Sequence, residues 1–188
     1  DDLVTGVQTC ALPISLRKRG GPVKTSLVLC PATLLENWKR EAERFFPGLA
    51  TYLHHGPKRA NAPSFLSRFD LVITSYGTLT RDLEIFREVP FLCVIGDEAQ
   101  HLRNRKSQNA KAATVLHSEG RMLLTGTPVE NSVSDLTSLL DFLLPGAHPP
   151  LPSGARAEER TWSERRILKQ AGPYVLRRTK REIGRAHV

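Results

Sequence analysis

The sequence predicts an α/β fold, a doubly wound parallel sheet with helices on both of its faces. Short apolar runs begin near Ser26, Thr51, Asp70, Phe91 and Arg121, and segments with helical periodicity separate them. Such alternation is typical of βαβ units, whose connections build a parallel sheet. The 188 residues also suit one compact domain of ordinary size.

SLVLC (26–30) is the first expected strand, and Pro31 ends it. A helical pattern follows over 34–46, with apolar residues spaced for one face. We expect Thr33 to cap this helix, because Glu36 three residues later completes a capping box. The pattern assigns the aromatic residues of this helix to the core.

TYLHH (51–55) and FDLVITSY (69–76) are the next two strands, and a helical pattern follows over 79–86. His54 and His55 do not indicate a metal site, because neighbouring strand residues point to opposite faces.

FLCVIGDEAQHL (91–102) is a buried strand that ends in two adjacent carboxylates, Asp97 and Glu98. Ligands of parallel sheets bind just beyond the carboxyl ends of the strands. Mg²⁺ prefers one or two carboxylates together with water and phosphate oxygens. The pair therefore predicts a Mg-nucleotide site, in which Asp97 holds the hydrated metal and Glu98 orients or deprotonates the attacking water. A solvated acidic turn is the alternative for such a pair on its own.

RMLLTGTPVEN (121–131) is a further strand that runs into a sharp turn. Thr125 and Thr127 would place hydroxyls at the same sheet edge as the carboxylates, where they can sense the γ-phosphate. The next helix carries a leucine stripe over 136–143, for which core packing is the better interpretation.

The chain has 27 Lys and Arg residues against 19 Asp and Glu, a net charge of +8, which favours a polyanionic partner. Cys30 and Cys93 lie in apolar runs without zinc-ligand spacing, so we expect small core residues in a reducing compartment. No apolar run reaches membrane-spanning length, and the start lacks a signal-peptide layout. We therefore expect a cytoplasmic or nucleoid-associated protein.

The two ends of the chain differ from the rest. VTGVQTCALPIS (4–15) and IGRAHV (183–188) match translations of the two strands of a common sequencing adapter. We therefore interpret residues 1–15 and 183–188 as adapter-derived and leave them out of the fold.

Five segments occur in a fixed order: LCPATLLENWKRE (29–41), DLVITSYGTL (70–79), DEAQHLRN (97–104), LLTGTPVENSVSDLTSLLDFLLPG (123–146) and YVLRRTKRE (174–182). Together they resemble the first motor lobe of the Swi/Snf-type DNA-translocating ATPases of helicase superfamily two. The resemblance covers most of Ser26 to Glu182. It implies a RecA-like lobe with ATP and Mg²⁺ as cofactors, and double-stranded DNA with its bound proteins as partners.

The resemblance also implies residue roles. Asp97 and Glu98 become the metal-binding and water-activating acids of a DEAQ box. Four further residues would bind the nucleotide or transmit its state: Gln100, Thr125, Gly126 and Thr127. Two strand-end segments would contact the DNA backbone: Pro31, Ala32, Thr33 and Thr74, Ser75, Tyr76. Gly96 departs from the family pattern, which has a larger apolar residue at this position.

Superfamily-two ATPases need a phosphate loop, GxxxxGK[ST], whose amides and Lys hold the β- and γ-phosphates. GGPVKTS (20–26) lacks the glycines at the required spacing, so we read Lys24 and Thr25 as a connector. We expect a partial ATP-binding lobe over 16–146, a linker or shortened insertion over 147–172, and the start of a connection to a second lobe over 173–182. We expect such a fragment to be inactive alone.

Two other functions stay open. A strand-separating helicase or restriction-type motor of the same superfamily would share these motifs, although the segment 174–182 argues against it. A non-catalytic DNA-binding module would use the same basic charge and keep the acids in a structural role.

Overall fold

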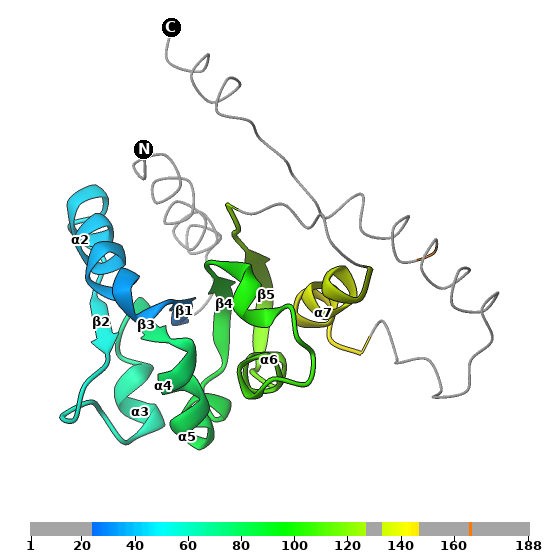
Figure 1. Ribbon diagram of the computed structural model, residues 1–188. Coiled ribbons are helices and arrows are strands. Elements are labelled where there is room, and N and C mark those ends of the chain that lie inside the picture. Colours follow the sequence, from blue (N-terminus) through cyan, green and yellow to red (C-terminus); the bar gives the residue numbers. More distant parts are fainter. Residues whose placement is uncertain (1–23, 127–132, 147–165, 167–188) are drawn as a thin grey trace, which may run out of the picture.

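The computed structural model describes residues 24–126, 133–146 and 166 (Figure 1). Five strands form one parallel sheet in the order β2-β3-β1-β4-β5. Their bounds are β1 (Ser26–Cys30), β2 (Thr51–His54), β3 (Leu71–Ser75), β4 (Phe91–Gly96) and β5 (Ser118–Leu123). The predicted parallel α/β class is confirmed.

Helices connect the strands within the described residues. They are η1 (Ala32–Leu34), α2 (Leu35–Phe45), α3 (Pro63–Leu66), α4 (Tyr76–Arg81), α5 (Leu83–Arg87), η2 (Ala99–Leu102), α6 (Gln108–Thr114) and α7 (Val133–Leu143). The helical patterns that follow the first, third and fifth strands are confirmed, and the pattern over 79–86 divides at Asp82 into α4 and α5.

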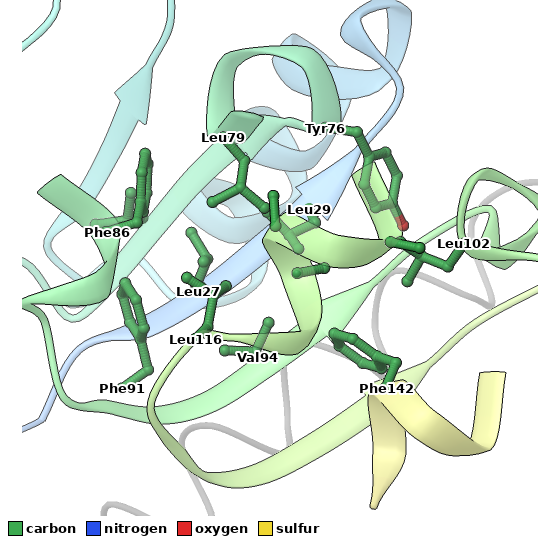
Figure 2. Packing of buried hydrophobic residues seen from close by; sticks show 14 of the residues in the cluster. Leu27, Leu29, Tyr76, Leu79, Phe86, Phe91, Val94, Leu102, Leu116 and Phe142 are labelled. Carbon is green, nitrogen blue, oxygen red and sulfur yellow. The ribbon is translucent and has the colours of Figure 1, made fainter. Parts of the chain in front are cut away.

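The sheet has helices on both faces, as predicted. Because strand residues alternate, β1 sends Val28 to the face under α2, where it joins a cluster with Leu35 and Trp38. Leu27 and Leu29 point to the opposite face, which packs against α3 to α7 (Figure 2). Both clusters are apolar and almost completely buried, so the sheet is the core of the described structure.

The predicted start of the first helix is wrong. The residues after Pro31 form a 3-10 turn, in which the Leu34 N–H donates to the Pro31 carbonyl at 2.9 Å. Thr33 therefore lies inside the turn, and α2 begins two residues later without a side-chain cap. Since Thr33 is not the residue that precedes α2, its hydroxyl cannot complete a box with Glu36.

Arg121 of β5 joins the sheet to two helices. Its guanidinium donates to the carbonyl of Ala113 at 3.2 Å, to that of Thr114 at 3.1 Å and to that of Phe142 at 3.0 Å. It also lies 5.1 Å from the centre of the Phe142 ring. One side chain thus satisfies carbonyls at the ends of α6 and α7 that no helical N–H can reach.

Of the cysteine prediction, the placement of Cys30 and Cys93 in the core is confirmed. Cys30 and Cys93 are free and buried. Burial raises their pKa values to about 12 and about 11, with the charge of Asp97 adding to the shift at Cys30. Neither thiol is therefore a ready nucleophile. Among the described helices, none has the length and apolar character needed to cross a bilayer.

Candidate nucleotide site

Asp97 is held by hydrogen bonds from three neighbouring elements. Its N–H donates to the Leu29 carbonyl of β1 at 2.7 Å, and its carbonyl accepts from the Tyr76 hydroxyl at 2.7 Å. Its carboxylate accepts from the Trp38 indole N–H at 2.8 Å through Oδ2, and from the Glu98 N–H at 2.9 Å through Oδ1. These bonds fix both the main chain and the carboxylate plane.

Glu98 has a left-handed backbone, with φ 54° and ψ 60°, and no other non-glycine residue in the described structure has a positive φ. This conformation is strained for a side chain and is a recurrent feature of functional sites. The turn allows the next N–H, of Ala99, to donate to the Leu124 carbonyl at 2.9 Å. The acidic pair is thereby tied to the residue before Thr125.

Crowding around residue 96 explains why a glycine stands there instead of the larger apolar residue of the family pattern. A Cβ on this residue would lie 2.7 Å from Leu123 Cδ2, 3.2 Å from the Tyr76 hydroxyl oxygen and 3.5 Å from Leu102 Cδ1. The space is thus already taken by neighbouring side chains, one of which makes the bond to the Asp97 carbonyl.

Three other expected nucleotide residues, Gln100, Thr125 and Gly126, also lie beyond the carboxyl ends of the strands. Gly96 pairs with Leu123, so the segments that follow β4 and β5 emerge side by side. Asp97 and Glu98 are half-buried, whereas Gln100, Thr125 and Gly126 are exposed. Thr127 lies outside the described residues.

Of the two expected DNA segments, the first is open to solvent. Ala32 and Thr33 are exposed beyond the end of β1, and Pro31 is half-buried. In the second expected DNA segment, all three side chains are buried and unavailable to DNA: Thr74, Ser75 and Tyr76. Their hydroxyls bond internally, to the His54 carbonyl at 2.8 Å, to Thr78 Oγ1 at 2.9 Å and to the Asp97 carbonyl. At this segment, a DNA contact therefore stays a prediction only for the main-chain groups.

Lys24 lies at the amino ends of the strands, whereas the acids lie at their carboxyl ends. It precedes the first residue of β1 and forms an ion pair with Glu119, near the start of β5. Thr25 donates to the Phe69 carbonyl at 2.8 Å. Because parallel strands share one direction, the starts of β1 and β5 are remote from the site at their carboxyl ends. The reading of Lys24 and Thr25 as a connector fits this placement.

The donor set fits a metal ion shared with phosphates. In the described residues, no three His, Cys, Asp or Glu side chains gather as a metal cluster. Two neighbouring carboxylates at a strand end are nevertheless what Mg²⁺ uses when waters and phosphate oxygens complete its octahedron. Asp97 is the residue that would hold it.

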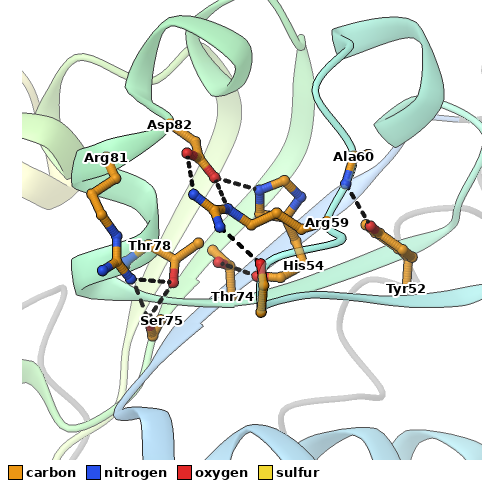
Figure 3. Close-up of polar contacts among 10 residues, drawn as sticks. Tyr52, His54, Arg59, Ala60, Thr74, Ser75, Thr78, Arg81 and Asp82 are labelled. Carbon is orange, nitrogen blue, oxygen red and sulfur yellow. Dashed lines mark hydrogen bonds and ion pairs between the residues drawn. The ribbon is translucent and has the colours of Figure 1, made fainter.

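Two features escaped the sequence reading. The first is the bond from Trp38 to the Asp97 carboxylate, for which a tryptophan on a buried helical face was the available signal, since a buried indole N–H needs an acceptor. The second is a polar cluster at the end of β2, formed by His54, Arg59 and Asp82 (Figure 3). Neither histidine nor arginine spacing in the sequence indicated it.

Asp82 is the centre of this second cluster. Arg59 binds both of its oxygens, with Nη2 at 2.8 Å from Oδ1, and His54 Nε2 lies 2.8 Å from Oδ2. The Arg59 hydrogen bond is the largest cause that lowers the Asp82 pKa to about 2, and the His54 hydrogen bond also lowers it. His54 is fully buried, and this burial lowers its pKa below the usual 6.5 despite Asp82.

A parallel sheet that carries two acids beyond its fourth strand, beside a threonine-bearing turn after its fifth, defines a RecA-like lobe. The chain matches the SNF2-related domain over residues 6–187. It therefore belongs to the SNF2-related family, which confirms the resemblance inferred from the motifs.

Relatives agree with this assignment. The chain is 31% identical over 198 residues to YwqA of Bacillus subtilis (strain 168), provisionally named an ATP-dependent helicase/translocase, covering 97% of this chain and 21% of that protein. It is 40% identical over 128 residues to the helicase-like transcription factor of Homo sapiens, covering 64% and 13%. It thus spans about a fifth or less of these relatives.

A solved structure gives the same result. The SWI2/SNF2 ATPase core of Sulfolobus solfataricus in complex with dsDNA is 32% identical, with a TM-score of 0.76. The match covers 93% of this chain and 38% of that core.

Proposed function

We propose that this chain forms part of the first lobe of an ATP-dependent DNA translocase that remodels protein–DNA complexes. Two main-chain hydrogen bonds support this most. The Asp97 N–H donates to the Leu29 carbonyl near the end of β1, and the Ala99 N–H donates to the Leu124 carbonyl just after β5. The acids that would handle ATP therefore share hydrogen bonds with the strand that leads to the exposed turn at Ala32, where DNA would bind.

In this mechanism Asp97 would hold a hydrated Mg²⁺, and the metal would supply neutralisation of the phosphate charge. Glu98 orients the attacking water and accepts its proton. Thr125, Gly126 and Thr127 detect the γ-phosphate, and Gln100 links them to the acids. The main chain around Thr33 holds the DNA backbone through N–H groups and the exposed threonine hydroxyl.

Catalysis needs parts beyond these residues. The 188 residues contain no GxxxxGK[ST] sequence, and in the proposed mechanism the groups that hold the β- and γ-phosphates would come from other parts of the ATPase core. The second lobe would supply an arginine finger, which contributes about 10³- to 10⁵-fold in rate in related phosphoryl transfers.

The test is steady-state ATP hydrolysis by the full-length protein that contains this lobe, with and without duplex DNA. We expect DNA to stimulate hydrolysis, and Glu98→Gln to reduce kcat by at least about 100-fold while nucleotide binding persists. A Glu98→Gln protein with wild-type turnover would refute the proposed role of Glu98. Duplex unwinding in a strand-displacement assay would instead favour the helicase alternative.

A further inference from the structure

Trp38 makes a contact that core packing does not require. The side chain is 6% exposed and packs in the apolar cluster with Leu35 and Ala42 of the same helix. Its indole N–H nevertheless donates to a charged acceptor, Oδ2 of Asp97, at 2.8 Å. A hydrogen bond to an ionised group is stronger than one to a neutral carbonyl, so this contact constrains the carboxylate as well as satisfying the indole.

The two N–H donors to Asp97 act on different oxygens. Glu98 donates to Oδ1 and Trp38 to Oδ2, so together they set the rotation of the carboxylate about its χ2 angle. Each oxygen retains a second lone pair with which it can accept from a metal-bound water. Removal of the Trp38 donor would therefore free one end of the carboxylate and leave the other end held.

Helix α2 connects this contact to the exposed turn at the end of β1. The turn η1 runs directly into α2, and Trp38 lies one helical turn further along. Leu35 and Trp38 are both buried, so the first turn of the helix packs against the sheet. A displacement of Ala32 or Thr33 would be transmitted through α2 to the Asp97 carboxylate.

We propose that Trp38 is a positioning residue that couples the exposed turn at Ala32 and Thr33 to the orientation of the Asp97 carboxylate. The proposal rests on the proposed function, since the coupling would make hydrolysis depend on DNA bound at that turn. Trp38 itself touches neither nucleotide nor DNA in this scheme.

The hydrogen bond can be tested on the 188-residue chain by ¹H–¹⁵N NMR of the indole groups. The sequence has two tryptophans, Trp38 and Trp162, and Trp38→Phe assigns their signals. We expect the Trp38 N–H to exchange slowly with solvent, and Asp97→Asn to shift its resonance. An Asp97→Asn protein whose Trp38 signal is unchanged would overturn the proposal.

The coupling is tested in the full-length protein by kcat for ATP measured with and without duplex DNA. Trp38→Phe keeps an aromatic ring in the cluster and removes the donor. We expect the ratio of the two kcat values to fall about tenfold or more, the effect of losing a hydrogen bond to a charged group. Leu35→Val is the matched control, because it alters the same cluster and leaves the bond intact.

A second variant covers the case in which Trp38→Phe does not fold. Replacing Trp38 by 3-benzothienylalanine, in a Trp162→Phe background, puts sulfur in place of the N–H and keeps the shape. Stimulation lost in this protein and kept in the Leu35→Val protein supports the coupling. Equal stimulation in the folded analogue and its parent overturns the coupling alone, whereas a wild-type protein that DNA does not stimulate overturns the proposed function as well.

Discussion

The hydroxyl of Tyr76 donates a hydrogen bond of 2.7 Å to the main-chain carbonyl of Asp97, from the first residue of α4 to the residue after β4. The ring is stacked on His101 with centroids 5.1 Å apart. Burial raises the pKa of Tyr76 far above its usual value, and the charge of Asp97 adds to this. The hydroxyl therefore keeps its proton, and can donate, at neutral and moderately alkaline pH.

Tyr76→Phe should lower the free energy of unfolding by about 1 kcal/mol, because a buried carbonyl loses its donor. Tyr52→Phe is the matched control, since its hydroxyl oxygen accepts from the Ala60 N–H at 2.9 Å, away from the acids. Both should unfold at lower urea concentration. Only Tyr76→Phe should shift the Trp38 indole resonance, and the expectation fails if Tyr52→Phe shifts it equally.

Gly96→Ala should destabilise the lobe by roughly 1 kcal/mol, at the low end for an overpacked core, because Leu123 and Tyr76 can yield by small movements. Gly120→Ala tests the same change in β5, where the nearest atom would be the Leu92 carbonyl at an ordinary 3.7 Å. Chemical denaturation compares the two variants. Equal losses of stability would show that crowding at residue 96 is unimportant.

Glu98→Gly should raise the free energy of unfolding by about 0–1.5 kcal/mol. It relieves roughly 1–2 kcal/mol of left-handed strain and adds about 0.5–1 kcal/mol of chain entropy to the unfolded state. Glu98→Gln keeps the strain and should leave stability nearly unchanged. A Glu98→Gly protein less stable than Glu98→Gln in thermal denaturation would contradict this origin of the strain.

Acid should weaken the cluster around Asp82 in two stages. Burial lowers the pKa of His54 in the folded protein. As pH falls below about 6.5, His54 is therefore protonated in the unfolded chain before it is protonated in the folded one, and the free energy of unfolding declines. The ionised Asp82 carboxylate stabilises the folded protein above its ordinary pKa of 3.8. This stabilisation is lost as pH falls towards the pKa of about 2 that Asp82 has in the folded protein. Protonation of Asp82 in this second stage should lower the free energy of unfolding by about 2 kcal/mol.

Two variants separate the stages of this acid response. In urea titrations from about pH 7.5 to about pH 5, His54→Gln should flatten the first decline, because an amide does not titrate. Asp82→Asn should lose most of its stability difference from wild type only in strong acid. If His54→Gln followed the wild-type pH profile unchanged, His54 would not be the group responsible.

The purified 188-residue chain should release no phosphate from ATP above background, because its residues contain no GxxxxGK[ST] sequence to hold the phosphates. A coupled phosphate assay with Mg-ATP and duplex DNA measures this, and the Glu98→Gln chain sets the background. Steady release that disappears in the variant would contradict the expectation.

Much of the fold follows from local signals. Each apolar run predicted a strand because buried parallel strands are continuous apolar segments, and the acids fell at a strand end because the run stops there. The boundary at Thr33 failed for a physical reason. Pro31 begins a tight turn at once, and a capping box seen in the sequence cannot reveal a 3-10 turn that moves the helix start.

The parts of the site that were missed all depend on contacts between distant residues. Trp38 and Asp97 are brought together by the crossing of α2 over the sheet, and Tyr76 meets Asp97 only because β3 and β4 flank β1. The hydroxyls of Thr74 and Ser75 looked available for DNA because the sequence places them at a strand end. Burial there comes from α4 and β2, which no local pattern near these residues indicates.

The central position of β1 sets the order in which the protein can assemble during synthesis. β1 leaves the ribosome before the other four described strands, yet the partners of Ser26 and Leu27 are Leu71 and Val94, which emerge much later. A nascent chain that stops before β4 would leave β1 with at least one edge unpaired, an arrangement prone to aggregation. Translation pauses within residues 31–90 would therefore place the greatest demand on chaperones that shield such segments.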